Sequence, residues 1–288
     1  MKLSNILKTT GAFALIAGTA HAQGFSGTAS FEYDFLSSIS PDGSISSNDY
    51  ESTYEVSNLG LDIDWTSAGG YTYGANAVFS YGSKAGAAND DSFSSGTQVD
   101  LRFGRDFGTI YAEVFAGYLD SIGEDNGENS IRYFGGIAAS YEISNNMILT
   151  GQIGYLDGTE GTDDDGMDGL AEAVFASIGT TYNINNSIAV GLNVAGASGV
   201  MDDDTPRESA SIWEVQANVH YIPAAYPAWD IFATVSYASY FQGDDEYETL
   251  NDTSVGIGVA YHFGATSVRS APVLPLAKWV AVTAGPME

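Results

Sequence analysis

The chain has 288 residues, with 9 basic and 37 acidic side chains, 34 glycines, 36 aromatic residues (18 Tyr, 14 Phe and 4 Trp) and no cysteine. This strong excess of acids argues against a nucleic-acid-binding protein, and the lack of cysteine excludes a disulfide framework, a thiolate metal site and a thiol nucleophile. The glycine and aromatic content favours a fold rich in strands, and no motif for a cofactor is present.

The first 22 residues have the pattern of a cleaved signal peptide. Lys2 and Lys8 precede a short apolar stretch over 11–20, and Ala20 and Ala22 flank His21 in an A-x-A cleavage site. The apolar stretch is shorter than the roughly 20 residues that a membrane-spanning helix needs. We therefore expect residues 1–22 to be removed on export, and the mature chain to begin with residue 23.

From residue 25 to residue 263, apolar and polar residues alternate repeatedly over about ten positions, which is typical of strands with two different faces. In the first segment Phe31, Tyr33 and Phe35 share one face, and Glu32 and Asp34 share the other. The segments are 25–35, 54–65, 71–81, 97–107, 109–118, 131–143, 147–155, 173–184, 187–194, 211–222, 231–241 and 253–263.

Two segments depart from this alternation. Tyr54 and Val56 are out of phase with the rest of the second segment, which suggests a β-bulge. In the fifth segment Tyr111 and Phe115 share the face of Glu113. The register of the fifth strand is therefore less clearly specified.

The connections alternate between tight links and long polar loops. The tight links are 68–70, 108, 144–146, 185–186 and 223–229, and the long loops are 38–50, 85–96, 121–130, 158–170, 201–209 and 243–251. The long loops hold 20 of the 37 acidic residues, and the tight links hold none. This pattern is typical of periplasmic turns and extracellular loops. The sequence predicts an all-β fold, a transmembrane antiparallel up-and-down β-barrel of about twelve strands.

Aromatic residues near both ends of the strands favour the same fold. They lie at the tight-link ends (Trp65, Tyr71, Phe107, Tyr141, Tyr182, Tyr221, Trp229, Tyr261 and Phe263) and at the loop ends (Phe35, Tyr81, Tyr118, Tyr155 and Phe241). Such positions predict two girdles at the membrane interfaces. A soluble β-sandwich, the structural alternative, has no need of aromatic residues at both ends.

The last segment places Val255, Ile257, Val259, Tyr261 and Phe263 on one face. It resembles the C-terminal assembly signal of bacterial outer-membrane proteins, and residues 23–263 are similar to porin-like outer-membrane β-barrels. The resemblance implies a location in the bacterial outer membrane and contact with its lipids and lipopolysaccharide. It also implies that the barrel-assembly machinery recognises Tyr261 and Phe263.

Members of this family usually end at that phenylalanine, but this chain continues over 264–288. The C-terminal extension contains Pro272, Pro275 and Pro286 and an apolar run around Trp279. A periplasmic extension, a plug in the lumen and a gene-model artefact all fit this composition. The first is slightly favoured, and the role of the extension stays open.

The polar faces of the segments are predicted to line the lumen. The candidate lining residues are Glu32, Asp34, Asp62, Asp64, Asn76, Asp100, Arg102, Glu113, Arg132, Gln152, Glu214, Gln216 and Asn218. An acidic lining predicts passive diffusion of small hydrophilic solutes with a bias toward cations. Twelve strands are fewer than the 16 to 18 of wide porins, so we expect a narrow channel.

Two other functions remain open. Arg102 and Arg132 are able to pair with acids across the lumen, which would give a structural or surface-interaction barrel with a filled interior and acidic cation-binding loops. An enzyme is less favoured. The mature chain has only His220 and His262, both on the inward face near the tight links, and catalysis needs a nucleophile within hydrogen-bond reach of its base.

The acidic loops suggest calcium, but no specific metal site. Asp163, Asp165, Gly166 and Glu172 match ligand and turn positions of an EF-hand loop, whereas its first position is Gly161. The flanking segments are predicted strands rather than helices. We therefore expect only loosely bound divalent cations at a solvated anionic surface.

Overall fold

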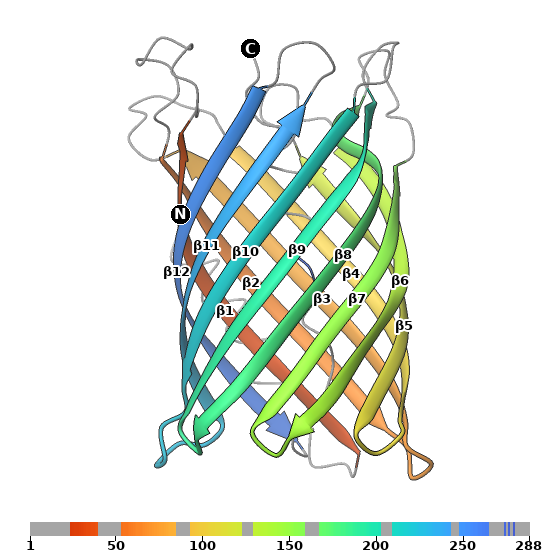
Figure 1. The fold of residues 1–288 in the computed structure, drawn as a ribbon, viewed down its shortest axis with the longest axis vertical. Helices are drawn as coiled ribbons and strands as arrows, with labels where there is room; N and C mark the ends of the chain where they lie inside the picture. The colour runs from red at the N-terminus through yellow and green to blue at the C-terminus, as the bar shows by residue number, and fades with distance from the viewer. Residues whose placement is uncertain are drawn as a thin grey trace, which may run out of the picture.

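The computed structural model describes residues 24–39, 53–84, 93–122, 129–158, 167–202, 209–242 and 248–264, together with Leu274, Leu276 and Trp279. Twelve antiparallel strands close into one barrel, in which each strand pairs with its neighbours in sequence and β1 pairs with β12 (Figure 1). The predicted fold class is confirmed. The described residues include no helix with the length and apolar character needed to cross a membrane.

The strands are β1 (Phe25–Ile39), β2 (Thr53–Thr66), β3 (Tyr71–Lys84), β4 (Phe93–Asp106), β5 (Ile110–Ile122), β6 (Asn129–Ser144), β7 (Met147–Gly158), β8 (Met167–Asn185), β9 (Ile188–Asp202), β10 (Ser209–Tyr221), β11 (Trp229–Gln242) and β12 (Glu248–Gly264). All twelve predicted segments are therefore strands, although their ends differ from the predicted ones.

Five short connections join the strands at one end of the barrel, at the bottom of Figure 1. They span 67–70, 107–109, 145–146, 186–187 and 222–228, in close agreement with the predicted tight links. Gly70 and Gly108 have φ of 76° and 91°, a conformation that residues with a Cβ rarely adopt. We call this end of the barrel the turn end.

Several strands extend further from the turn end than predicted. β8 has 19 residues and β9 has 15, so they include parts of the loops predicted over 158–170 and 201–209. The missed residues include runs of small side chains such as 195–199, which do not alternate clearly between apolar and polar residues, and alternation is the signal that marks a strand.

The β-bulge predicted near Tyr54 is wrong. β2 keeps an unbroken register with both of its neighbours, and Val56 lies opposite Asp34 of β1. The register shifts instead within β6 and β8. In β2 an apolar side chain shares the face of polar ones, without an inserted residue.

The outer surface of the barrel is an apolar band between two sets of aromatic side chains. Leu101, Ile137 and Ile257 are 67%, 58% and 60% exposed. The exposed aromatic residues include Trp65, Tyr71, Phe107, Tyr141, Tyr182, Tyr221 and Trp229 toward the turn end, and Phe35, Tyr81, Tyr118, Tyr155 and Phe241 toward the other. An apolar surface around a closed barrel suits lipid rather than water, and the soluble sandwich is excluded.

The barrel closes where β1 and β12 pair over 26–39 and 251–264. The ring of Phe263 lies against Gly27 of β1, where an added Cβ would meet this ring and lie 2.5 Å from the main-chain oxygen of Asp62. An aromatic ring over a glycine of the neighbouring strand shields the backbone that the glycine leaves uncovered. Phe263 of the predicted assembly signal therefore packs against the strand that closes the barrel.

We predict that Gly27→Ala destabilises the barrel by about 1–3 kcal/mol, because the added methyl group forces Phe263 or the backbone to shift. Urea unfolding of the protein in detergent micelles measures the change. Gly151→Ala is the matched control: an added Cβ there has its nearest contact at 3.5 Å, from the main-chain oxygen of Ser177. This control should be neutral or stabilising by up to about 1 kcal/mol. Equal stability of the two variants would contradict the packing role of Phe263.

Candidate functional site

The half of the barrel interior near the turn end contains a charged cluster around Arg102 of β4. Nη2 of Arg102 donates to Oδ2 of Asp62 at 2.7 Å and to Oδ1 of Asp64 at 3.3 Å. Nε of Arg102 lies 3.9 Å from Oδ1 of Asp100, and the side chains of Arg102 and Asp100 are each 3% exposed. We call these four residues the Arg102 cluster. Because the Arg102 cluster contains three carboxylates and one guanidinium, its formal charge is negative.

A glycine on the intervening strand makes this contact possible. Gly74 of β3 is the register partner of both Asp64 on β2 and Arg102 on β4. A Cβ at residue 74 would meet the carboxylate of Asp64 and lie 2.9 Å from Nε of Arg102. The guanidinium therefore crosses β3 to reach β2 only because residue 74 has no side chain.

Neutral groups bind carboxylates beside the cluster. Nδ2 of Asn76 donates to Oδ2 of Asp100 at 2.9 Å. On β5, the hydroxyl of Tyr111 donates to Oε2 of Glu113 at 3.0 Å, and both side chains are buried. Tyr111 and Glu113 share one face, as predicted from the irregular fifth segment, but the sequence did not identify their hydrogen bond.

A second polar group joins β1 to strands on both sides of it. Oγ1 of Thr234 donates to Oε1 of Glu32 at 2.9 Å, and Nδ2 of Asn58 donates to Oδ2 of Asp34 at 3.0 Å. Gly256 lies between Asp34 and Thr234 in the register, and a Cβ there would meet both side chains. The same arrangement as at Gly74 thus lets a side chain contact reach across one strand.

Two further candidate residues have partners on other strands, Arg132 of β6 on β8 across β7, and Gln152 of β7 on the adjacent β8. Arg132 is fully buried, and its Nε donates to the main-chain oxygen of Leu170 at 2.7 Å. Nε2 of Gln152 donates to Oγ of Ser177 at 3.1 Å. Neither residue contributes to the Arg102 cluster, so the structure separates the two arginines that the sequence grouped as lumen residues.

Apolar side chains also gather in the half of the interior away from the turn end, beside buried polar residues such as Arg132 and Asp252. The buried residues that pack together there are Leu119, Phe134, Leu156, Leu170, Ala173, Phe175, Ala195, Ala197, Ala210, Ile212, Ala238, Tyr240, Leu274, Leu276 and Trp279, with Phe115 packed against them. We call this set the apolar cluster. The sequence did not predict the apolar cluster. Some of its residues were assigned to neither face of a strand, and the small alanines among them hid the apolar pattern.

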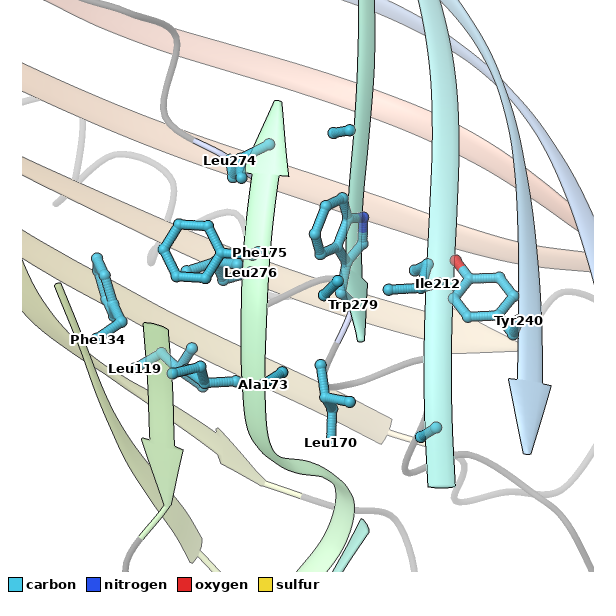
Figure 2. Close-up of a cluster of buried hydrophobic side chains, with 14 of the residues drawn as sticks. Leu119, Phe134, Leu170, Ala173, Phe175, Ile212, Tyr240, Leu274, Leu276 and Trp279 are labelled. Carbon is cyan, nitrogen blue, oxygen red and sulfur yellow. The ribbon is translucent and has the colours of Figure 1, made fainter. Parts of the chain in front are cut away.

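Three members of the apolar cluster follow the last strand. Leu274, Leu276 and Trp279 are 3%, 2% and 0% exposed, and Figure 2 shows them among Phe175 and Ile212 of the barrel wall. These three residues, which we call the tail, therefore lie in the lumen. This placement differs from the periplasmic extension that the sequence favours.

Glu214 of β10, one of the candidate lining residues, forms a hydrogen bond with the tail. Nε1 of Trp279 donates to its Oε2 at 2.8 Å, and the carboxylate is buried. The two other candidates on this strand, Gln216 and Asn218, are half-buried. A small cavity lies where the two clusters meet, and its wall includes Arg102 and Leu274.

The two histidines have partners that the sequence did not identify. Nδ1 of His220 and Oδ2 of Asp230 are 2.7 Å apart, on opposite sides of the 222–228 turn. Nδ1 of His262 lies 2.9 Å from Oγ1 of Thr28, whereas its Nε2 is 3.8 Å from Asp230. The pairing of β10 with β11 and of β12 with β1 brings these groups together, and no short sequence motif marks them.

The part of the chain that the structure describes contains no arranged metal-binding site. No group of three or more His, Asp or Glu side chains there is arranged to hold a metal ion. Asp163, Asp165 and Gly166 of the EF-hand-like segment lie outside the described residues, and Glu172 belongs to β8.

No protein-family model matches the sequence, and no curated protein is similar to it in sequence. Solved structures are similar in fold. A deltaS2 mutant of the TodX monoaromatic hydrocarbon channel matches with a TM-score of 0.54 and 10% identity, over 88% of this chain and 94% of that chain. An outer-membrane channel from Pseudomonas putida F1 matches with a TM-score of 0.53 and 9% identity, over 85% and 98%. The predicted fold of a bacterial outer-membrane β-barrel is thus confirmed.

Arg102→Met should destabilise the barrel by about 3 kcal/mol or more, because it leaves buried carboxylates without their cation. Urea unfolding in micelles measures the loss. Arg105→Met is the control, since Arg105 is exposed and lies 4.8 Å from the ring centre of Tyr71. Its loss should cost less than about 1 kcal/mol. Equal costs at the two positions would argue against a structural role for the Arg102 cluster.

Proposed function

We propose that this outer-membrane β-barrel is a narrow channel through which small hydrophilic solutes diffuse passively, with a preference for cations. The observation that carries the proposal is the acidic inner wall. Among the described residues, the buried charged side chains are Asp34, Asp64, Asp100, Glu113, Glu214, Asp230 and Asp252 against Arg102 and Arg132. Such an excess of acids in a wall of low dielectric concentrates cations in the lumen.

The structural comparisons favour transport over a purely structural role. The two matching structures reported above, with TM-scores of 0.54 and 0.53, are described as channels. TodX is described as a channel for monoaromatic hydrocarbons, whereas the carboxylate-rich side of the present lumen favours hydrophilic solutes. The proposal therefore takes its solute class from the lining of this chain.

The second candidate is a structural or surface-interaction barrel with a filled lumen. Its supporting observation is the apolar cluster, which occupies part of the interior together with Trp279. In either function we propose that lipopolysaccharide and loosely bound divalent cations contact the acidic loops. The barrel-assembly machinery would recognise Tyr261 and Phe263 of β12.

A catalytic function is not favoured by the arrangement of the histidines. A triad needs one histidine within hydrogen-bond reach of both a nucleophile and an acid. His262 lies 2.9 Å from the hydroxyl of Thr28 but 3.8 Å from Asp230. His220 contacts Asp230 at 2.7 Å, and its ring stacks on Phe232. We therefore propose a protein without enzymatic activity.

Planar-bilayer recording of the purified protein tests the channel. We expect small stepwise conductances, and in a potassium chloride gradient a reversal potential displaced toward the equilibrium potential of potassium. Folded insertions that never conduct, in the wild-type protein and after loss of its tail contacts alike, would contradict a channel and favour the filled barrel.

The double variant Glu32→Gln and Asp34→Asn should move the reversal potential toward zero, because it removes two negative charges from the inner wall. Both substitutions keep the shape of the side chain and an oxygen that accepts the hydrogen bond. Asp157→Asn is the control, since Asp157 is exposed on β7 beside the outward Tyr155. A reversal potential that is the same in the double variant and the wild type would contradict the charge-based selectivity.

A further inference from the structure

The apolar cluster is incomplete without the C-terminal residues. Leu274, Leu276 and Trp279 are almost fully buried within it, although they come after the last strand of the barrel. Figure 2 shows the indole ring of Trp279 near Ile212, and Leu276 near Phe175. The tail therefore occupies the lumen in the half away from the turn end.

The wall is shaped to receive a bulky ring. Its inward positions on β8 to β11 carry small side chains within the same cluster: Ala173, Ala195, Ala197, Ala210 and Ala238. A barrel of twelve strands encloses more space than such small side chains fill. The ring of Trp279 supplies the missing volume, so the wall has the form of a binding site with an occupant.

A hydrogen bond adds a polar contact to this site. Trp279 has no exposed surface, and its Nε1 donates to the buried carboxylate of Glu214 at 2.8 Å. A buried polar group needs hydrogen-bond partners, so loss of this donor is costly unless another donor replaces it. A pocket lined by apolar side chains with few polar groups is the usual form of a site for a small molecule.

We infer that Leu274, Leu276 and Trp279 narrow the lumen by occupying a binding site for a small molecule that combines an apolar ring with one N–H or O–H donor. This inference rests on the proposed channel function. A molecule of this class competes with Trp279 for Glu214 and for the alanine-lined wall. The molecule then takes the place of the Trp279 ring, and the displaced Leu274 and Leu276 no longer restrict the path between the two halves of the lumen.

The cavity beside the tail shows how the release opens a path. Leu274 and Leu276 lie on its wall together with Phe134, and its other side is formed by Gln98, Asp100 and Arg102. Removal of the two leucine side chains joins this cavity to the space that the tail vacates. Solutes then have a passage from the Arg102 cluster into the half of the lumen away from the turn end.

Bilayer recording tests the closure in the full-length chain. The triple variant Leu274→Ser, Leu276→Ser and Trp279→Ser should conduct in steps at least threefold larger than the wild type. Trp213→Phe is the control, because Trp213 is 40% exposed on the outer face of β10. It should conduct as the wild type does. Equal steps in the triple variant and the wild type overturn the closure but leave the channel standing, whereas silence of both overturns the channel itself.

Calorimetry with indole tests the binding site. The triple variant in detergent should bind indole at least tenfold more tightly than the wild type, whose site is occupied. It should bind 1-methylindole, which lacks the N–H donor, about tenfold more weakly than indole. Failure of the triple variant to bind indole overturns the site, and equal binding by the wild type overturns its occupation by the tail.

A single substitution keeps the inference testable if the triple variant does not fold. Trp279→Phe retains a ring in the alanine-lined wall and removes only the donor to Glu214. Its tail should be displaced more readily, so indole should bind it more tightly than the wild type. Indole affinity equal to that of the wild type overturns the proposed role of the hydrogen bond.

Discussion

Closure of the barrel is the constraint on which the rest of the structure depends. Backbone N–H and C=O groups inside a lipid bilayer must pair with one another, and an open sheet edge would leave a row of them unpaired. In this chain β1 pairs with β12 along 26–39 and 251–264, so no strand is left at an edge. Phe263 packs over Gly27 at this seam, so the last aromatic residue of β12 contributes to the closure of the folded barrel.

Once the barrel is closed, every strand has one face toward lipid and one toward the interior. Apolar side chains that face lipid need no partner, but charged groups on the inner face do. Arg102 meets this requirement by reaching Asp62 and Asp64 across Gly74, two strands away from its own. The register set by the tight turns thus decides which charges meet, and the missing side chain at residue 74 decides that they can touch.

The sequence predicted the strands and their faces because alternation is a local signal. It placed Asp64, Arg102 and Glu214 on inward faces, but it did not specify their partners, which depend on strand register or on distant segments. Trp279 contacts Glu214 from 65 positions away, and the tail has no period that marks an inward face. The prediction of a bulge in β2 was wrong for a related reason. In the sequence, an apolar side chain on the inner face looks the same as a one-residue shift in the alternation of apolar and polar residues.

The carboxylate-rich part of the lumen and the apolar cluster have opposite requirements for contact with water, and the tail lies within the apolar cluster. The carboxylate-rich part is stable in contact with water, whereas exposure of the apolar cluster would cost about 1.5–3 kcal/mol for each large side chain such as Phe134 or Phe175. An empty, water-filled channel would therefore be unfavourable beside this cluster without an apolar occupant. Trp279 and its two neighbouring leucines provide one from the same chain. A small molecule with a similar apolar ring replaces these side chains at a smaller cost in free energy than water does. The apolar wall therefore favours opening by a ligand over spontaneous opening.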